Sequence, residues 1–348
     1  MQSLARLNGP YLNDLLDQPR AVATTLAGMP NDLAPPRVWL DRHRVVLTGM
    51  GSSLHALNPL QLRLVAAGHT ALLVETAELV HSQSALLDPR SLVVAVSQSG
   101  RSAETVQLLD LIANIAPSGR PHVIGVTNTA DSPLALRADA LIQLRAGPEF
   151  SVSCKTYLAT IVGLEWLGAL LLGADLRALG AALAPTPDAI STYLAAWPAH
   201  VRELAAFLAP ARSIFLTGRG TSLAAVGAGA LILKESTRMH AEGMSAPSFR
   251  HGPLEMTGPE LALLAFEGEA ATADLNRRLV VDVRAAGGLA ALIGPSAELS
   301  AFRLPTLAPE VRPLFEMLAA QMVSLALALL RDREPGRFER ATKVTIVA

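Results

Sequence analysis

Hydrophobic residues in the first half of the chain form short continuous runs that end at glycine, serine or asparagine. Three of them are RVVLTG (44–49), SLVVAVSQSG (91–100) and HVIGVTN (122–128). Runs of this kind are typical of buried parallel strands that end at a loop. Over residues 102–116 the apolar positions instead follow helical spacing, and we expect Val106, Leu109 and Ala113 to share one face. The pattern predicts strands alternating with helices.

The same pattern returns 169 residues later. LTGMGSSLHA, which begins at Leu47, and LTGRGTSLAA, which begins at Leu216, are identical at seven of ten positions. The three hydrophobic runs have partners at this offset without a gap: SIFLTG (213–218), ELALLAFEGE (260–269) and ALIGPSA (291–297). Chance similarity of two glycine-rich turns does not explain three runs in register. The predicted fold class is α/β, with two doubly wound parallel-sheet domains in tandem.

The repeat and the prolines set the expected domain limits. The segment APTPDAI (184–190) carries two prolines and fits a connection between the two domains. We expect an N-terminal helical segment, a first domain, a second domain and a C-terminal tail: residues 1–30, 31–185, 190–335 and 336–348.

The two copies differ where their second strand ends. The first copy continues as Ser97-Gln98-Ser99-Gly100-Arg101-Ser102, whereas the second reads Phe266-Glu267-Gly268-Glu269. Ligands collect beyond the carboxyl ends of parallel strands, and hydroxyls and amides before a helix N-terminus can hold an anion. Ser102 fits the N-cap of the following helix. The first loop therefore suits a phosphate, and the two carboxylates of the second would repel one. A polar turn with capping serines is the alternative interpretation.

Composition narrows the class of protein. The formal net charge is −1 and no Lys/Arg run offers a track for nucleic acid. A single cysteine, Cys154, excludes a disulfide framework and a multi-cysteine metal site. The N-terminus lacks a signal-peptide pattern. Residues 157–174 are strongly apolar but contain Glu165, which favours a buried helix over a membrane span. These features predict a soluble cytoplasmic protein that binds neither nucleic acid nor a membrane.

Four stretches resemble the SIS (sugar isomerase) domain family, over about residue 20 to 348: TGMGSSLHA, VAVSQSGRSAET, GALILKESTRMHAEGMSAPSFRHGP and ATKVTIVA. The chain is most similar to the tandem members, the isomerase half of glutamine–fructose-6-phosphate amidotransferase and the related glucosamine-6-phosphate deaminases. Residues 97–102, called the serine loop from here on, by themselves mark any phosphosugar-binding SIS domain. The series KE, HAE and HGP with a lysine near the end of the sequence marks the amino-sugar branch.

The resemblance implies a set of site residues. Substrate binding is expected at Ser52, Ser53, Ser97, Gln98, Ser99, Ser102, Ser151 and Ser153. Glu235 matches the carboxylate that moves a proton between C1 and C2. His251 matches the ring-opening histidine, which relatives supply from the neighbouring subunit, so a homodimer with shared active sites is expected. Lys343 matches the lysine that meets the sugar's carbonyl carbon.

The chemistry of these residue types agrees with the implied roles. One flexible carboxylate can serve two adjacent carbons, and a histidine titrates near neutral pH. A lysine can form an imine or stabilise an oxyanion. Without the resemblance, Glu235 would be interpreted as a solvated helix end, His251 as a turn residue and Lys343 as a surface lysine.

A metal site and a cofactor are not expected. His240 and Glu242 are the tempting pair, but on a helix residues i and i+2 do not face each other, and no PCxxC follows. The predicted partner is therefore a small sugar phosphate alone.

Three departures from the family pattern bear on the reaction. Ile232 stands where relatives often carry a lysine, and the loop at 147–157 is one residue shorter. No N-terminal cysteine of a glutaminase is present. We therefore expect the ammonia-releasing direction, glucosamine 6-phosphate and water giving fructose 6-phosphate and ammonia. The variants at 97–102 and 144–147 are also closer to the deaminases. The alternatives are a fructosamine-type 6-phosphate deglycase and a non-catalytic sugar-phosphate sensor.

Overall fold

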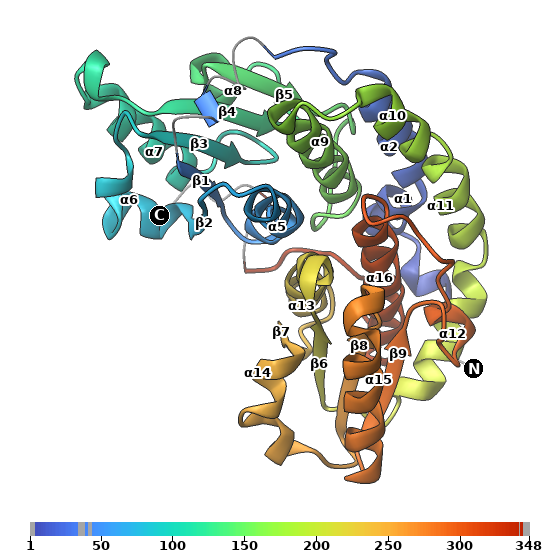
Figure 1. Cartoon of the computed structure of the whole chain (residues 1–348). Coiled ribbons are helices and arrows are strands. Elements are labelled where there is room, and N and C mark those ends of the chain that lie inside the picture. The colour runs from blue at the N-terminus through green and yellow to red at the C-terminus, as the bar shows by residue number, and fades with distance from the viewer. Residues whose placement is uncertain (1–3, 34–38, 41–43, 341, 344–348) are drawn as a thin grey trace. The chain divides into compact units, whose positions relative to one another are not determined.

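The structure, a computed structural model, describes residues 4–33, 39–40, 44–340 and 342–343, which fold as two units (Figure 1). Unit 1 comprises Met1–Gln18, Phe150–Cys154 and Asp188–Glu339, and unit 2 comprises Pro19–Glu149, Lys155–Pro187 and Arg340–Ala348. The boundary between Pro187 and Asp188 falls inside helix α11 (Thr186–Ala195). The segment 184–190, expected as a connection, contains this boundary: residues 184–185 form a turn and residues 186–190 begin the helix. Of the predicted tail, 341 and 344–348 lie outside the described residues.

Unit 2 is built on a five-stranded parallel sheet of order β2-β1-β3-β4-β5. Its strands are β1 (Arg44–Gly49), β2 (Ala71–Glu75), β3 (Ser91–Val96), β4 (His122–Thr127) and β5 (Ala140–Gln143). One face packs against α6 (Thr76–His81), α7 (Ala103–Asn114) and α8 (Pro133–Arg137). The other face carries α4 (Ser52–Ala56), α5 (Asn58–Ala66) and α9 (Lys155–Leu172). The described part of this unit also includes α2 (Gln18–Ala27) and α10 (Leu176–Leu183).

Unit 1 has a four-stranded parallel sheet of order β7-β6-β8-β9. Its strands are β6 (Ser213–Gly218), β7 (His240–Ser245), β8 (Leu261–Phe266) and β9 (Leu289–Ile293). On one face lie α14 (Ala246–Arg250) and α15 (Ala270–Ala285), and on the other α13 (Leu223–Thr237), with α16 (Arg312–Leu330) packed on it. The other α-helices are α1 (Pro10–Leu16) and α12 (Trp197–Leu208). Two parallel-sheet α/β domains confirm the predicted fold class.

The face of α7 differs from the expectation. Thr105, Leu108, Leu109 and Ile112 are its buried residues besides Glu104, whereas Val106 is half-buried and Ala113 is exposed. The helix starts at Ala103, so its inward stripe runs through i, i+3, i+4 and i+7 from Thr105. Only Leu109 of the expected three faces the core.

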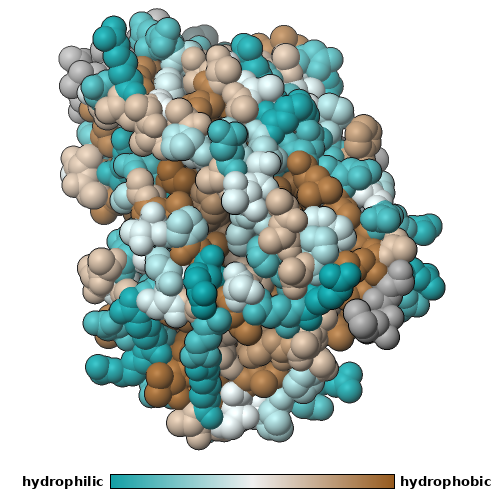
Figure 2. All heavy atoms as spheres, turned by 90° about the vertical axis from the view of Figure 1, so that its right-hand side faces the viewer, coloured by the Kyte–Doolittle hydropathy of each residue, from teal (hydrophilic) through white to brown (hydrophobic). Residues whose placement is uncertain are grey.

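Two helices, α9 and α16, are long and apolar enough to cross a membrane by length and composition. They are 89% and 94% buried, as core helices are. The carboxylate in the middle of α9, Glu165, is paired with Arg63 at 3.2 Å in the same unit. The molecular face in Figure 2 mixes hydrophilic and apolar residues. The predicted buried helix at 157–174 is therefore confirmed, with bounds Lys155–Leu172; residues 173 and 174 lie beyond its end and are exposed.

Candidate functional site

The serine loop follows β3 directly, at the centre of the unit 2 sheet. Gly100 has φ +61°, a left-handed conformation that glycine adopts without strain, and it turns the chain toward α7. The Ser97 hydroxyl accepts a bond from the Gly100 amide at 3.1 Å. The Ser99 hydroxyl accepts one from the Arg101 amide at 3.2 Å. The loop is thus closed by its own side chains.

Two amide donors of this loop take no part in those internal bonds. Within the described part of the chain, the amides of Gln98 and Ser99 donate no hydrogen bond. Ser102 occupies the N-cap position of α7, as predicted, although its hydroxyl bonds Thr105 Oγ1 at 2.7 Å rather than the backbone. The first-turn amides of α7 are therefore not capped by Ser102. Unpaired amides next to a helix N-terminus are the donors that an anion needs.

The second serine pair lies at the same sheet edge. Gly49 at the end of β1 is in register with Val96 at the end of β3. Ser52 and Ser53 begin α4 just beyond β1, and both are half-buried. Unit 2 thus brings the predicted substrate-binding serines of both loops to the carboxyl edge of two adjacent strands.

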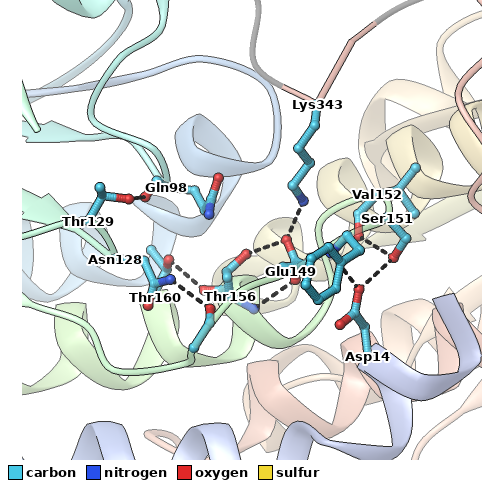
Figure 3. Close-up of polar contacts among 12 residues, drawn as sticks. Asp14, Gln98, Asn128, Thr129, Glu149, Ser151, Val152, Thr156, Thr160 and Lys343 are labelled. Carbon is cyan, nitrogen blue, oxygen red and sulfur yellow. Dashed lines mark hydrogen bonds and ion pairs between the residues drawn. The ribbon is translucent and has the colours of Figure 1, made fainter. Parts of the chain in front are cut away.

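Asn128 connects the serine loop to the segment after β5 (Figure 3). Its backbone amide donates to the Gln98 carbonyl at 3.1 Å. Its side chain donates to the Gly147 carbonyl and accepts from the Ala146 amide, each at 2.9 Å. One asparagine therefore fixes the position of Glu149, two residues further on, relative to the serine loop.

Glu149 holds Lys343 by an ion pair (Figure 3). The Glu149 side chain is fully buried, and Thr156 donates to it twice, from its amide at 3.0 Å and from its hydroxyl at 2.7 Å. The Lys343 side chain is a quarter exposed. A buried carboxylate so restrained fixes the ammonium group of Lys343. Unit 2 thereby links Lys343 to the serine loop through Glu149 and Asn128.

Sequence reasoning missed Asn128 and Glu149 as site residues. Asn128 is the first residue after β4, so its place at the carboxyl edge of a parallel strand was the available signal. Glu149 stands in the short loop at 147–157 but resembles an ordinary exposed glutamate in sequence. Its burial depends on Thr156, a polar residue, and on Lys343, which is far away in the sequence. Hydrophobic periodicity predicts neither contact.

The other predicted residues belong to unit 1. Glu235 is exposed in the last turn of α13, just before β7 begins. His251 is exposed and follows α14, beyond the end of β7. Phe249 of α14 packs against Phe215 on one face of the unit 1 sheet, whereas Gly229 of α13 lies against Leu216 on the other face. Glu235 and His251 therefore stand at the ends of helices on opposite faces of this sheet. The structure does not bring them together within one chain.

Ser151 and Ser153 are also in unit 1. Ser151 is buried, and its hydroxyl donates to Asp14 at 3.0 Å, beside a bond from the Phe150 amide to the same oxygen (Figure 3). This bond to a carboxylate fixes the orientation of Ser151. Ser153 is half-buried.

His240 and Glu242 were expected on a helix, and this expectation is wrong. Both lie on strand β7, not on a helix, so i and i+2 share a face and the His240 Nε2 and Glu242 Oε1 atoms are 3.7 Å apart. Among the described residues, no group of three or more His, Cys, Asp or Glu side chains could hold a metal ion.

The corresponding loop of unit 1 has a different character. Glu267 is buried, and burial raises its pKa, but bonds from Ser296 and Arg277 outweigh this and lower the pKa below the usual range. Glu269 accepts from the Thr221 hydroxyl at 3.2 Å. The sheet edge that holds serines in unit 2 therefore holds carboxylates in unit 1.

The chain belongs to the SIS domain family, whose match covers residues 40–169 and 207–331. It is similar to the glutamine–fructose-6-phosphate aminotransferase (isomerizing) of Pyrococcus horikoshii, with 29% identity over 349 residues. That alignment covers 97% of this chain and 57% of the relative, so the chain spans little more than half the length of that protein. The similarity confirms the predicted relation to the isomerase half of such enzymes.

Solved structures share the fold. The C-terminal domain of glucosamine-fructose-6-phosphate aminotransferase from Francisella tularensis has a TM-score of 0.85 at 19% identity, covering 95% of this chain and 98% of that one. Glucosamine-6-phosphate deaminase from Thermotoga maritima has a TM-score of 0.79 at 15% identity, covering 97% and 100%. The proteins that this chain resembles thus include ones named for acting on phosphosugars.

Proposed function

We propose that this chain is an isomerising deaminase that converts glucosamine 6-phosphate and water into fructose 6-phosphate and ammonia. The observation that carries the proposal is in unit 2, where the serine loop and Lys343 are connected through Asn128 and Glu149, and the loop amides of Gln98 and Ser99 have no partner among the described residues. The amides suit a phosphate, and the ammonium suits a developing oxyanion on the sugar chain.

The proposed steps divide the proton transfers between two residues. His251 takes the proton of the O1 hydroxyl and returns a proton to the ring oxygen, which opens the ring. Glu235 then removes the proton from C2 and delivers it to C1, leaving an imine at C2. Water adds to that imine, and ammonia leaves as the C2 ketone forms. The exposed position of Glu235 at a helix end suits a carboxylate that must serve both carbons.

The cysteine content of these residues offers no nucleophile for glutamine. The single cysteine of these 348 residues, Cys154, is fully buried. A thiol that attacks glutamine must be accessible and ionised, so Cys154 does not suit that role. The releasing direction needs only the sugar phosphate and water.

We further propose a cytoplasmic homodimer in which each site takes His251 from the partner. The position of Glu235 and His251 at the ends of helices on opposite faces of the unit 1 sheet supports this arrangement, because the two proton transfers occur on one sugar.

The test is a Glu235→Gln variant assayed with glucosamine 6-phosphate for fructose 6-phosphate and ammonia. Turnover should fall by about 10²–10⁴-fold, as expected for loss of a general base, while sugar-phosphate affinity stays within about tenfold. In heavy water, the wild-type product should carry deuterium on C1. Glu260→Gln, an exposed glutamate of the same unit, is the matched control.

Other outcomes identify the alternatives. Wild-type turnover by Glu235→Gln contradicts the mechanism. Binding without turnover or exchange in the wild type identifies a sensor, and release of a free amino acid from a fructosamine 6-phosphate in preference to ammonia identifies a deglycase.

A further inference from the structure

A cavity of about 290 Å³ lies at the carboxyl edge of the unit 1 sheet. Its walls come from the loop after β8 with the start of α15, from the segments at 293–296 and 304–307, and from the first turns of α16. All of these belong to unit 1. The volume is close to the lower limit of pockets that bind small molecules.

Glu316 presents an unsatisfied oxygen in the wall of this cavity. The residue is 1% exposed, and its Oε1 atom accepts a bond from the Ser222 hydroxyl at 2.7 Å. Its Oε2 atom has no hydrogen-bond partner among the described residues. Burial raises the pKa of Glu316 to about 8, with Glu269 adding to the rise and Ser222 and Arg312 opposing it. At neutral pH the carboxyl group is therefore protonated, and because Oε1 is an acceptor, Oε2 carries the proton.

Arg312 supplies a second unsatisfied donor. It precedes Glu316 by four residues on α16, so both side chains lie on one face of the helix. Its Nη1 atom is buried without a hydrogen-bond partner in the described part of the chain, and Glu269 Oε1 is 3.9 Å away. Arg312 and Glu316 thus both line the cavity, and each has a buried polar atom without a hydrogen-bond partner in the described part of the chain.

The other charges of the wall are already satisfied. Glu267 is paired with Arg277 and accepts two bonds from Ser296, at 2.9 Å from the amide and 2.8 Å from the hydroxyl. With Glu316 protonated, the lining residues Arg277, Arg312 and Glu267 carry a net single positive charge, and Glu269, 3.9 Å from Arg312 and outside the lining, offsets part of it. Much of the remaining wall is apolar: Ala270, Ala273, Ile293, Leu304, Pro305 and Leu307.

We propose that this cavity binds a small organic monocarboxylate, whose oxygens accept hydrogen bonds from Arg312 and Glu316 and whose short apolar body packs on Ile293 and Leu304. An arginine fork and a carboxylic acid both form strong bonds to a carboxylate. A phosphate dianion fits poorly, because one net positive charge does not balance it and Glu267 and Glu269 lie close by.

The cavity is separate from the proposed catalytic residues. Ser222, which contacts Glu316, precedes α13, whereas Glu235 lies in the last turn of that helix. Thirteen residues of helix span about 20 Å, so the two positions are far apart in unit 1. The serine loop belongs to unit 2. The proposal therefore does not depend on the proposed deaminase activity.

The test is a titration of the full chain with isobutyrate, followed by ligand NMR at pH 6.5 and pH 9. We expect saturable binding at pH 6.5 and at least fivefold weaker binding at pH 9. Binding weakens with rising pH because of Glu316, which ionises above its pKa of about 8 and then no longer donates a hydrogen bond. Its negative charge also cancels the net positive charge of Arg312, Arg277 and Glu267, and Glu269 adds repulsion. Isobutyramide, which has the same shape without charge, should bind at least tenfold more weakly.

Variants locate the site. Arg312→Leu should weaken isobutyrate binding at least tenfold, whereas Arg278→Leu removes an exposed arginine from α15 and should have no effect. Glu316→Gln keeps a donor and should bind isobutyrate equally at both pH values. Isobutyrate should still bind the double variant Ser97→Ala/Ser99→Ala, and inorganic phosphate should not displace it.

Several results overturn the proposal. They are equal binding of the amide and the carboxylate, unchanged affinity in Arg312→Leu, retained pH dependence in Glu316→Gln, and displacement by phosphate. Thermal unfolding, measured on each variant, shows whether the protein is folded. A folded Arg312→Leu chain with wild-type isobutyrate affinity excludes the site as described.

Discussion

Ser97 and Ser99 have two tasks, because their hydroxyls brace the loop backbone while the neighbouring amides stay unpaired. Replacing both by alanine removes the brace and the hydroxyls that are proposed to contact phosphate. We expect Ser97→Ala/Ser99→Ala to weaken hexose 6-phosphate binding by at least about 2 kcal/mol, roughly thirtyfold. Calorimetric titration measures this, with the exposed Ser118→Ala as control. Equal turnover of unphosphorylated glucosamine by the wild type speaks against a phosphate site here.

Glu149 acts through Lys343, so we regard it as a positioning residue. Glu149→Gln keeps the side-chain shape and an acceptor for Thr156 but removes the charge that holds the ammonium. We expect kcat to fall by roughly 10- to 100-fold, as displacing a reacting group by about 1 Å does, with little change in phosphate affinity. Steady-state kinetics and phosphate titration separate the two effects.

A matched control for Glu149 exists in the same unit. Glu165 is also a buried carboxylate in an ion pair, with Arg63 at 3.2 Å. Glu165→Gln should lower the free energy of unfolding but leave kcat unchanged in the folded protein. If both variants lose kcat equally, the effect of Glu149 is one of stability and its positioning role is refuted.

At the scale of elements, the turn from β3 into α7 depends on Gly100. A Cβ atom at this position would lie 2.2 Å from Ser132 Oγ and 3.0 Å from Thr127 Oγ1, in addition to the strain of φ +61°. Gly68 also has a positive φ, +88°, but a Cβ atom there would meet no atom within 4 Å. Gly68→Ala should cost about 1 kcal/mol of unfolding free energy. Gly100→Ala should cost more and also weaken phosphate binding, as chemical denaturation and calorimetry can measure.

The strands that the sequence did not predict share a position in the sheets. They are β2, β5 and β7, and each is an edge strand. A central strand such as β3 is buried along its whole length and forms an unbroken apolar run in the sequence. An edge strand such as β7, HAEGMS, is mostly half-buried. Its polar residues interrupt the apolar run by which a strand is recognised in the sequence. The 169-residue offset held the missing information, because it carries Ala71, the start of β2, onto His240, the start of β7.

The site was predictable to a different degree from the fold. The serines follow strands and a known pattern, so their common sheet edge could be foreseen from local sequence. The Glu149–Lys343 pair joins residues 194 positions apart, and the Glu316–Ser222 contact spans 94. Contacts at such separations depend on the packing of elements rather than on local spacing, so hydrophobic periodicity does not show them.

At the scale of the whole molecule, the two copies of the repeat share their strand order but differ in the side chains at the carboxyl edge of the sheet. The order β2-β1-β3-β4 in unit 2 matches β7-β6-β8-β9 in unit 1, strand for strand. In unit 2, serines and loop amides without a partner among the described residues follow β3. In unit 1, Glu267, Arg312 and Glu316 surround a cavity. Duplication thus supplied two carboxyl edges, and their side chains suit ligands of different charge.

The last prediction concerns how many chains form one active site. Glu235 and His251 stand at the ends of helices on opposite faces of the unit 1 sheet, so the proposed mechanism takes His251 of one chain to serve Glu235 of another. His251→Ala and Glu235→Gln homodimers should each be nearly inactive. A mixed dimer, however, contains one site with both wild-type residues. Mixing the two variants under conditions that exchange subunits should therefore restore up to about a quarter of wild-type activity per total chain, since half of the dimers are mixed and one of their two sites is intact. Mixing either variant with itself is the control. A wild-type protein that is monomeric by light scattering and active at nanomolar concentration rules out the shared site, as does a mixture that stays inactive after mass spectrometry has shown mixed dimers.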